Sequence, residues 1–293
     1  MRIIAATPRS IPIPDDIRAA LDTVARDELR ALAERIAVPR VYGTPENEAA
    51  RRLVADLFSA SPVARLGVKV DEVGNVVVGN PSQARILLGA HYDAVPGTPG
   101  ADDNASAVAA ILSAARAIGP RDDVCFVAFN GEECGFVGSR HLVEQRLGQH
   151  RLEQVHVLEM VGFTNRSPGS QRNPVLSLPV PTVSDFLGLV GTHCSARVLD
   201  HVLDRAGLST IPVYGLYLPD LPLEMMRLKV PHAFRSDHAP FWYAGISALM
   251  WTDTAEFRNP NYHQATDTPN TLDYDFMAEV AKLLVHVVLS EIE

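Results

Sequence analysis

Four apolar segments of this chain are followed by side chains that could do acid–base or metal chemistry. The segments have the composition of buried strands and are RILLGA (85–90), VCFVAF (124–129), VHVL (155–158) and ISALMW (246–251). The side chains that follow them are carboxylates and imidazoles, namely His91, Asp93, Glu132, Glu133, Glu159 and, after a further loop, His263. Each residue alone is common at a strand end or in a loop. Their repetition at successive strand ends indicates a shared site.

The chemistry that this pattern favours is metal binding. The carboxyl ends of parallel strands meet at one edge of a sheet, where binding sites form. Carboxylates gathered there repel one another unless a cation lies between them. Histidine and carboxylate ligands without cysteine are typical of zinc, manganese or cobalt, and histidine-rich sites of low coordination number favour zinc. Two imidazoles and at least three carboxylates exceed what one catalytic zinc needs, so the pattern predicts two metals that share one carboxylate.

The elements that must position these side chains are strands that alternate with helices. Apolar spacing predicts helices over 25–37, 45–58, 105–118 and 272–292. The second of these helices has Thr44 as its N-cap and Pro45 at its first position. This alternation indicates an α/β fold with three layers, α/β/α, around a central twisted sheet that is mostly parallel but mixed. We expect one catalytic domain, residues 1–293, on which N-terminal helices (about 15–60) pack. Loop insertions at about 164–182 and 210–232 are expected to shape a pocket.

Composition excludes several other classes of protein. The chain has 293 residues, 47% hydrophobic content and a net charge of −9, so a basic surface for nucleic acid is not expected. No apolar run is long enough to predict a membrane span, and the segment MRIIAATPRS has too short an apolar core for a signal peptide. We therefore expect a cytoplasmic protein. The sequence contains neither GxSxG nor HExxH, and nothing in it indicates an oligomeric state.

Six motifs in order resemble metallopeptidase family 28, the co-catalytic zinc exopeptidases related to glutamate carboxypeptidases and glutaminyl cyclases. The motifs are GAHYD, GADDNAS, NGEECGFVGS, LEMVG, RSDHAPFWYAGI and NYHQATDTPNTLD. The resemblance implies a zinc-exopeptidase-like fold. It also implies an aminopeptidase that hydrolyses the N-terminal bond of a peptide or an aminoacyl amide, through a hydroxide that bridges two Zn²⁺ ions.

Carried over to this chain, the resemblance implies a role for each matched residue. The metal ligands would be His91 and Glu159 on one ion, Glu133 and His263 on the other, and Asp102 between the two ions. Glu132 would be the general base, Asp93 would orient His91, and Asp237 would orient His263. In the family the peptide bond after the bridging aspartate is often cis, which predicts a cis bond at Asp102–Asp103.

One departure from the family pattern keeps other functions open. Most peptidases of the family have aspartate where this chain has Glu159, so weaker binding of the ion held by His91 and Glu159 is expected, and a single zinc is an alternative. A glutaminyl cyclase-type acyltransferase with one zinc is therefore the first rival hypothesis. A non-catalytic binding domain is the second rival hypothesis. Against it, every matched position has a side chain that could bind metal or transfer a proton.

Overall fold

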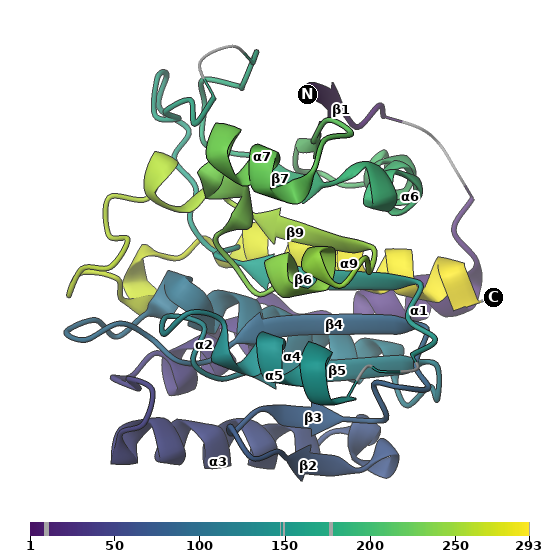
Figure 1. Cartoon of the computed structure of the whole chain (residues 1–293), viewed down its shortest axis with the longest axis vertical. Helices are drawn as coiled ribbons and strands as arrows, with labels where there is room; N and C mark the ends of the chain where they lie inside the picture. The colour runs from purple at the N-terminus through teal and green to yellow at the C-terminus, as the bar shows by residue number, and fades with distance from the viewer. Residues whose placement is uncertain (9–11, 147, 149, 176–177, 293) are drawn as a thin grey trace.

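The computed structural model of the chain describes residues 1–8, 12–146, 148, 150–175 and 178–292. Its described residues form one mixed sheet that runs through the molecule from β2 at one end to β1 at the other (Figure 1). The strands, in their order across the sheet, are β1 (Arg2–Ala5), β8 (Val213–Tyr217), β7 (Leu187–Gly191), β9 (Ala248–Thr252), β6 (Gln154–Glu159), β4 (Ile86–His91), β5 (Val124–Phe129), β3 (Val76–Val78) and β2 (Val68–Val70).

The four central strands are parallel, and an antiparallel pair joins them to the rest of the sheet on each side. β4 pairs in parallel with both β5 and β6, and β6 pairs in parallel with β9. The hairpin β2–β3 lies antiparallel beside β5, while β7 is antiparallel to β9. The prediction of a mostly parallel, mixed sheet is therefore confirmed, and the carboxyl ends of β4, β5, β6 and β9 meet at one edge.

Helices cover both faces of the sheet and make two separate apolar cores. One face packs against α1 (Asp15–Asp22), α2 (Arg26–Ile36), α3 (Pro45–Ser59), α4 (Ala107–Ile118), α6 (Ala196–Ala206) and α9 (Tyr274–Ile292). The other packs against α5 (Val137–Arg146), α7 (Leu223–Lys229) and α8 (His238–Tyr243). Successive residues of a strand face opposite sides, which is why Leu88 belongs to the first core and Leu87 to the second.

Local sequence signals explain where several of these elements begin. Thr44 caps α3, because its hydroxyl oxygen accepts a hydrogen bond from the backbone N–H of Asn47 at 3.2 Å. β2 and β3 form a hairpin, and Gly74 in the connection between them has a positive φ of 90° that suits glycine. Among the helices of the described residues, none combines the length and the hydropathy that a membrane span needs.

The two expected loop insertions have different structures. Within its described residues, 164–182 contains no helix or strand and makes one isolated bridge, from Asn165 to Ser184. The expectation of irregular structure over 210–232 is wrong, because this range contains β8 and α7. β8 is only five residues long and prolines flank it closely, so its pattern is too short to be distinguished from a loop.

Candidate metal centre

The predicted site residues converge at the carboxyl edge of the parallel strands. His91 is the last residue of β4 and Glu159 is the last residue of β6. Glu132 and Glu133 lie in the turn between β5 and α5, and His263 lies in the loop after β9. The topology therefore brings together side chains that are more than 170 positions apart in the sequence.

Asp103 lies between two groups of potential metal ligands. Its Oδ1 is 3.3 Å from His91 Nε2, which is itself 3.4 Å from Glu159 Oε2. Its Oδ2 is 3.1 Å from His263 Nε2, which is 3.6 Å from Glu133 Oε1. The arrangement is two triads, each with one imidazole, one glutamate and one oxygen of the same aspartate.

The prediction that Asp102 would bridge the two ions is wrong by one residue. Asp102 points away from the triads: its Oδ1 accepts from the Gly162 N–H at 2.9 Å and its Oδ2 from Asn259 Nδ2 at 2.6 Å. Asp103 has non-helical backbone angles at the start of the turn into α4, so the two neighbouring side chains point in different directions. The cis peptide bond is likewise at Asp103–Asn104, not at Asp102–Asp103.

The unsatisfied atoms of this cluster fit a bound cation. His91 Nε2, Asp103 Oδ1, Glu133 Oε1 and His263 Nε2 are all buried and have no hydrogen-bond partner among the described residues. Buried polar side-chain atoms in folded proteins almost always have one. Imidazole nitrogens and carboxylate oxygens are the donor set that zinc takes in catalytic sites. These residues therefore fit zinc.

The electrostatics of the cluster favour positive charge between its carboxylates. Burial opposes ionisation of Asp103, but the imidazoles of His263 and His91 outweigh burial and hold its pKa below the usual range. Burial also disfavours the charged form of His263, yet Asp103 and Glu133 raise its pKa to about 10. The carboxylates thus favour a positive charge at this position, which a proton supplies here and a bound divalent cation would supply in its place.

Asp93 contacts the residues that its predicted role requires and also supports the turn beyond them. Its Oδ1 is 3.5 Å from His91 Nδ1, the ring nitrogen that faces away from the triads. The same carboxylate accepts the backbone N–H groups of Glu132 at 3.1 Å and Glu133 at 3.2 Å. Asp93 therefore fixes both an imidazole of one triad and the turn that carries a glutamate of the other.

Glu132 belongs to neither of the two triads that share Asp103, but its carboxylate lies beside them, in a group with His91 and Glu133. Its Oε2 is 4.0 Å from His91 Nε2, and its side chain is almost buried. Burial is the main reason that the pKa of Glu132 is well above its usual value, and the Glu159 carboxylate raises it further. A carboxyl group with a raised pKa next to a metal site is suited to accept and release a proton.

The predicted role of Asp237 is wrong. Its Oδ1 accepts a hydrogen bond from Ser139 Oγ at 2.5 Å, and burial raises its pKa to about 7. His263 instead stacks on Tyr262, with ring centroids 3.8 Å apart. The RSDH motif does reach the cluster, but through Ser236, whose hydroxyl donates to Glu159 Oε2 at 2.7 Å.

Sequence reasoning missed two residues that hold the Asp103 loop. Asp267 accepts the backbone N–H groups of Asp102 at 2.9 Å and Asp103 at 3.1 Å. Its position four residues after His263 in a matched motif was the available signal. Arg40 donates to carbonyls of the same loop from the connection between α2 and α3, and no acidic or imidazole neighbour in its sequence marks it.

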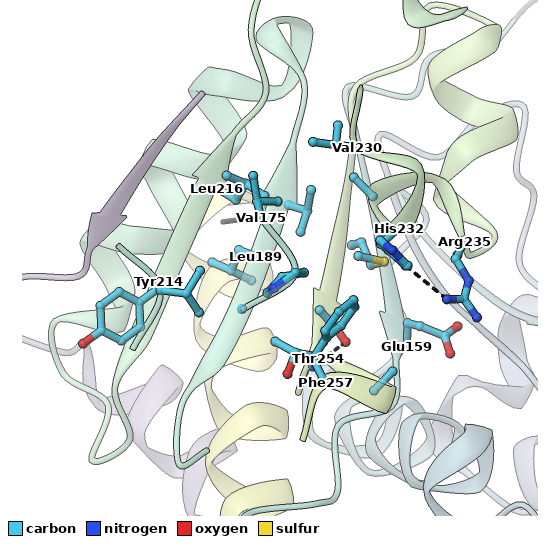
Figure 2. Close-up of a pocket in the computed structure, with 18 of the residues that line it drawn as sticks. Glu159, Val175, Leu189, Tyr214, Leu216, Val230, His232, Arg235, Thr254 and Phe257 are labelled. Carbon is cyan, nitrogen blue, oxygen red and sulfur yellow. Dashed lines mark hydrogen bonds between the residues drawn. The ribbon is translucent and has the colours of Figure 1, made fainter. Parts of the chain in front are cut away.

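An apolar pocket with a volume of about 160 Å³ adjoins the cluster at Glu159 and Tyr262. Figure 2 shows Glu159, His232 and Arg235 on one side of it and Tyr214 and Leu216 on the opposite side. Its apolar lining comes from β7, β8 and β9 and from the segments around them, and includes Val175, Val180, Phe186, Val190, Val230, Met250 and Phe257. Residues of both segments that were expected to shape a pocket thus line this one.

Comparison with known proteins identifies a family for most of this region. The family model described as peptidase family M28 matches residues 73–186 and 224–288. The protein YfbL of Escherichia coli is 35% identical over 213 residues, which cover 67% of this chain and 63% of that protein. Aminopeptidase YwaD of Bacillus subtilis is 28% identical over 217 residues, 71% of this chain and 41% of that protein. The chain thus spans between 41% and 63% of the length of these two relatives.

Solved structures share the fold over nearly the whole chain. The LapA aminopeptidase of Legionella pneumophila has a TM-score of 0.71 at 20% identity and covers 96% of this chain and 76% of its own. The zinc aminopeptidase BSAP of Bacillus subtilis has a TM-score of 0.62 at 17% identity, with coverage of 97% and 96%. A glutaminyl cyclase of Porphyromonas gingivalis has a TM-score of 0.63 at 17% identity, with coverage of 92% and 99%. These similarities confirm the predicted α/β fold.

Proposed function

Because the chain belongs to peptidase family M28, as its sequence motifs predicted, we propose that it is a zinc-dependent aminopeptidase. Its substrate would be a peptide or an aminoacyl amide with a free N-terminus. The observation that carries the proposal is the pair of triads that share Asp103, with Glu132 beside them.

The triads assign ligands to two zinc ions. His91 and Glu159 would hold one ion, Glu133 and His263 the other, and Asp103 would contribute one oxygen to each. Zinc supplies Lewis-acid polarisation of the scissile carbonyl and lowers the pKa of water toward neutrality. Glu159 is one methylene longer than the aspartate that is usual in the family. Its carboxylate still lies with His91 and Asp103, since the ligand atoms of the three residues lie within 4.8 Å of one another.

The protein's own groups then move the proton and fix the geometry. Glu132 would take a proton from the attacking water and deliver it to the amine that leaves, so that one carboxylate serves as base and then as acid. Asp93 would keep the His91 ring and the Glu132–Glu133 turn in place during this transfer. The Ser236 hydroxyl would hold Glu159 in the same way.

The pocket beside Glu159 supports action at an N-terminal residue. An apolar side chain that fills the pocket would lie next to Glu159, and so would place the adjoining amide bond beside the metal cluster. Pockets for small ligands commonly combine an apolar lining with a few polar groups that fix orientation. We therefore propose that large apolar N-terminal residues are preferred.

The test of this function gives the zinc-loaded protein two arylamides and one substrate with an N-terminal glutamine. We expect hydrolysis of leucyl arylamide, no hydrolysis of its N-acetylated counterpart, and loss of activity on chelation that zinc reverses. Conversion of an N-terminal glutaminyl substrate to a cyclic product without release of a residue would instead support the cyclase alternative. Equal hydrolysis of blocked and free substrates would contradict an aminopeptidase.

Gly188 offers a test of the pocket. It lies in β7 opposite Thr252, which pairs with Glu159 in the next ladder. A Cβ at Gly188 would lie 3.3 Å from the Thr252 carbonyl oxygen and 3.7 Å from its methyl group, so a side chain there requires the neighbouring strand to shift by a few tenths of an ångström. We expect Gly188→Val to lower kcat/KM for leucyl arylamide by roughly tenfold, because the side chain takes pocket volume.

Alanyl arylamide is the control for this variant, since its small side chain leaves the pocket mostly empty. Its kcat/KM should change little, and the zinc content of Gly188→Val should equal that of the wild type. An equal loss with both substrates would mean that this pocket does not receive the N-terminal side chain.

A further inference from the structure

Arg40 is a fully buried cation whose guanidinium contacts the loop between His91 and Asp103. Its side chain donates to the backbone carbonyls of Tyr92, Pro99 and Gly100, the last at 2.7 Å from Nη2. The carbonyl of Asp103 itself lies 3.5 Å from the same nitrogen. Arg40 thus holds the loop that carries Asp103 through its carbonyl groups.

The buried charge of Arg40 acts on the acidic cluster without a direct ion pair among the described residues. Burial lowers its pKa to about 10, while the carboxylates of Asp103, Asp93, Asp267 and Glu133 oppose that loss. The guanidinium therefore stays charged at neutral pH. An uncompensated buried cation is costly, and its cost here is offset by carbonyl dipoles and by the carboxylates of the site.

The loop is enclosed on both sides. Asp267 accepts its N–H groups while Arg40 donates to its carbonyls. Gly100 has a positive φ of 61°, and a Cβ there would lie 2.3 Å from the Asp103 carbonyl oxygen and 3.0 Å from Arg40 Nη2. The backbone is thus folded closely around the guanidinium, which leaves the Asp103 backbone little freedom to move.

Arg40 comes from outside the matched family region. It lies in the connection between α2 and α3, whereas the family model begins at residue 73. α2 packs against α4, the helix that follows the Asp103 turn. The N-terminal helices and the metal cluster are therefore joined through one buried side chain as well as through apolar packing.

We propose that Arg40 is a positioning residue of the metal centre, which sets zinc affinity by fixing the Asp103 loop with its donors and its buried positive charge. This inference rests on the proposed zinc function. It assigns Arg40 no contact with substrate, so its effect should be visible in metal binding itself.

The test measures zinc affinity by competition with a chromophoric chelator, together with the thermal unfolding of each metal-free protein. Arg40→Ala should bind zinc about 10- to 100-fold more weakly than the wild type, which is the range for residues that orient a metal ligand without binding the metal. Arg40→Lys should lie between them, because lysine keeps the charge but not the planar fork of donors. Millimolar guanidinium ion should restore much of the affinity of Arg40→Ala.

Leu32→Ala is the matched control, because Leu32 is a buried residue of α2, the helix that precedes Arg40 in the chain. It should lower the unfolding temperature but leave zinc affinity unchanged and unresponsive to guanidinium. Wild-type affinity in folded Arg40→Ala, or equal losses in the two variants without rescue, would overturn the inference. If Arg40→Ala does not fold, Arg40→Lys must still bind zinc more weakly than Leu32→Ala. Failure of the wild type to bind zinc would instead contradict the proposed function.

Discussion

Replacement of Glu132 by glutamine is expected to lower kcat for leucyl arylamide by about 10²- to 10⁴-fold, the contribution typical of a positioned acid–base group. Glutamine keeps the size of the side chain but cannot accept and return a proton. Glu132 belongs to neither of the two triads that share Asp103, so we expect zinc stoichiometry and affinity to equal those of the wild type. Steady-state kinetics and metal analysis of the same preparation measure both effects.

Glu133→Gln is the control for this experiment, because it changes the neighbouring residue in the same turn. Glu133 belongs to the His263 triad, so this variant should lose zinc as well as activity. Zinc loss in Glu132→Gln as well would mean that Glu132 is a ligand. Full activity of Glu132→Gln would exclude it as the base.

Asp103→Asn should have the largest effect on metal binding. The change removes the charge that both imidazoles face and leaves one oxygen where two are needed. We expect zinc affinity to fall by more than about 100-fold, beyond the range for residues that only support a ligand. Hydrolysis should be lost with the metal. Isothermal titration calorimetry, in which zinc is added to the metal-free protein, measures the affinity.

Asp102→Asn is a control one residue away with the same chemical change. Burial, together with the nearby carboxylate of Asp253, raises the pKa of Asp102 well above its usual value, so an uncharged amide resembles its protonated form. Zinc affinity in this variant should stay close to that of the wild type. Normal zinc binding by Asp103→Asn and loss of binding by Asp102→Asn would reverse the structural assignment.

The fold and the convergence of the site were predictable because they depend on regular patterns. Continuous apolar segments such as 124–129 are typical of strands buried on both faces, and polar residues at their ends mark one edge of a parallel sheet. β8 was not predicted, because its five residues alternate between buried and half-buried positions and carry little periodic signal. Long apolar or periodic segments of the sequence therefore predicted helices and strands, whereas a segment as short as β8 did not.

Individual side-chain directions were less predictable than the site itself. Asp102 and Asp103 are identical residues in adjacent positions, and only the backbone angles of the turn decide which one faces the imidazoles. Asp237 was assigned to His263 by its motif, although tertiary packing directs it to Ser139. Arg40 was missed because its role depends on carbonyl groups, which every residue has.

The most direct test of the account is the number of zinc ions that restore leucyl arylamide hydrolysis to the chelated protein. Titration with zinc should bring activity to its maximum as bound zinc approaches two ions per chain, because the two triads share Asp103 and both are complete. Full activity with one bound ion would contradict the two-metal assignment and point to a single triad as the working site. Binding of zinc without any hydrolysis of unblocked substrates would contradict the aminopeptidase itself.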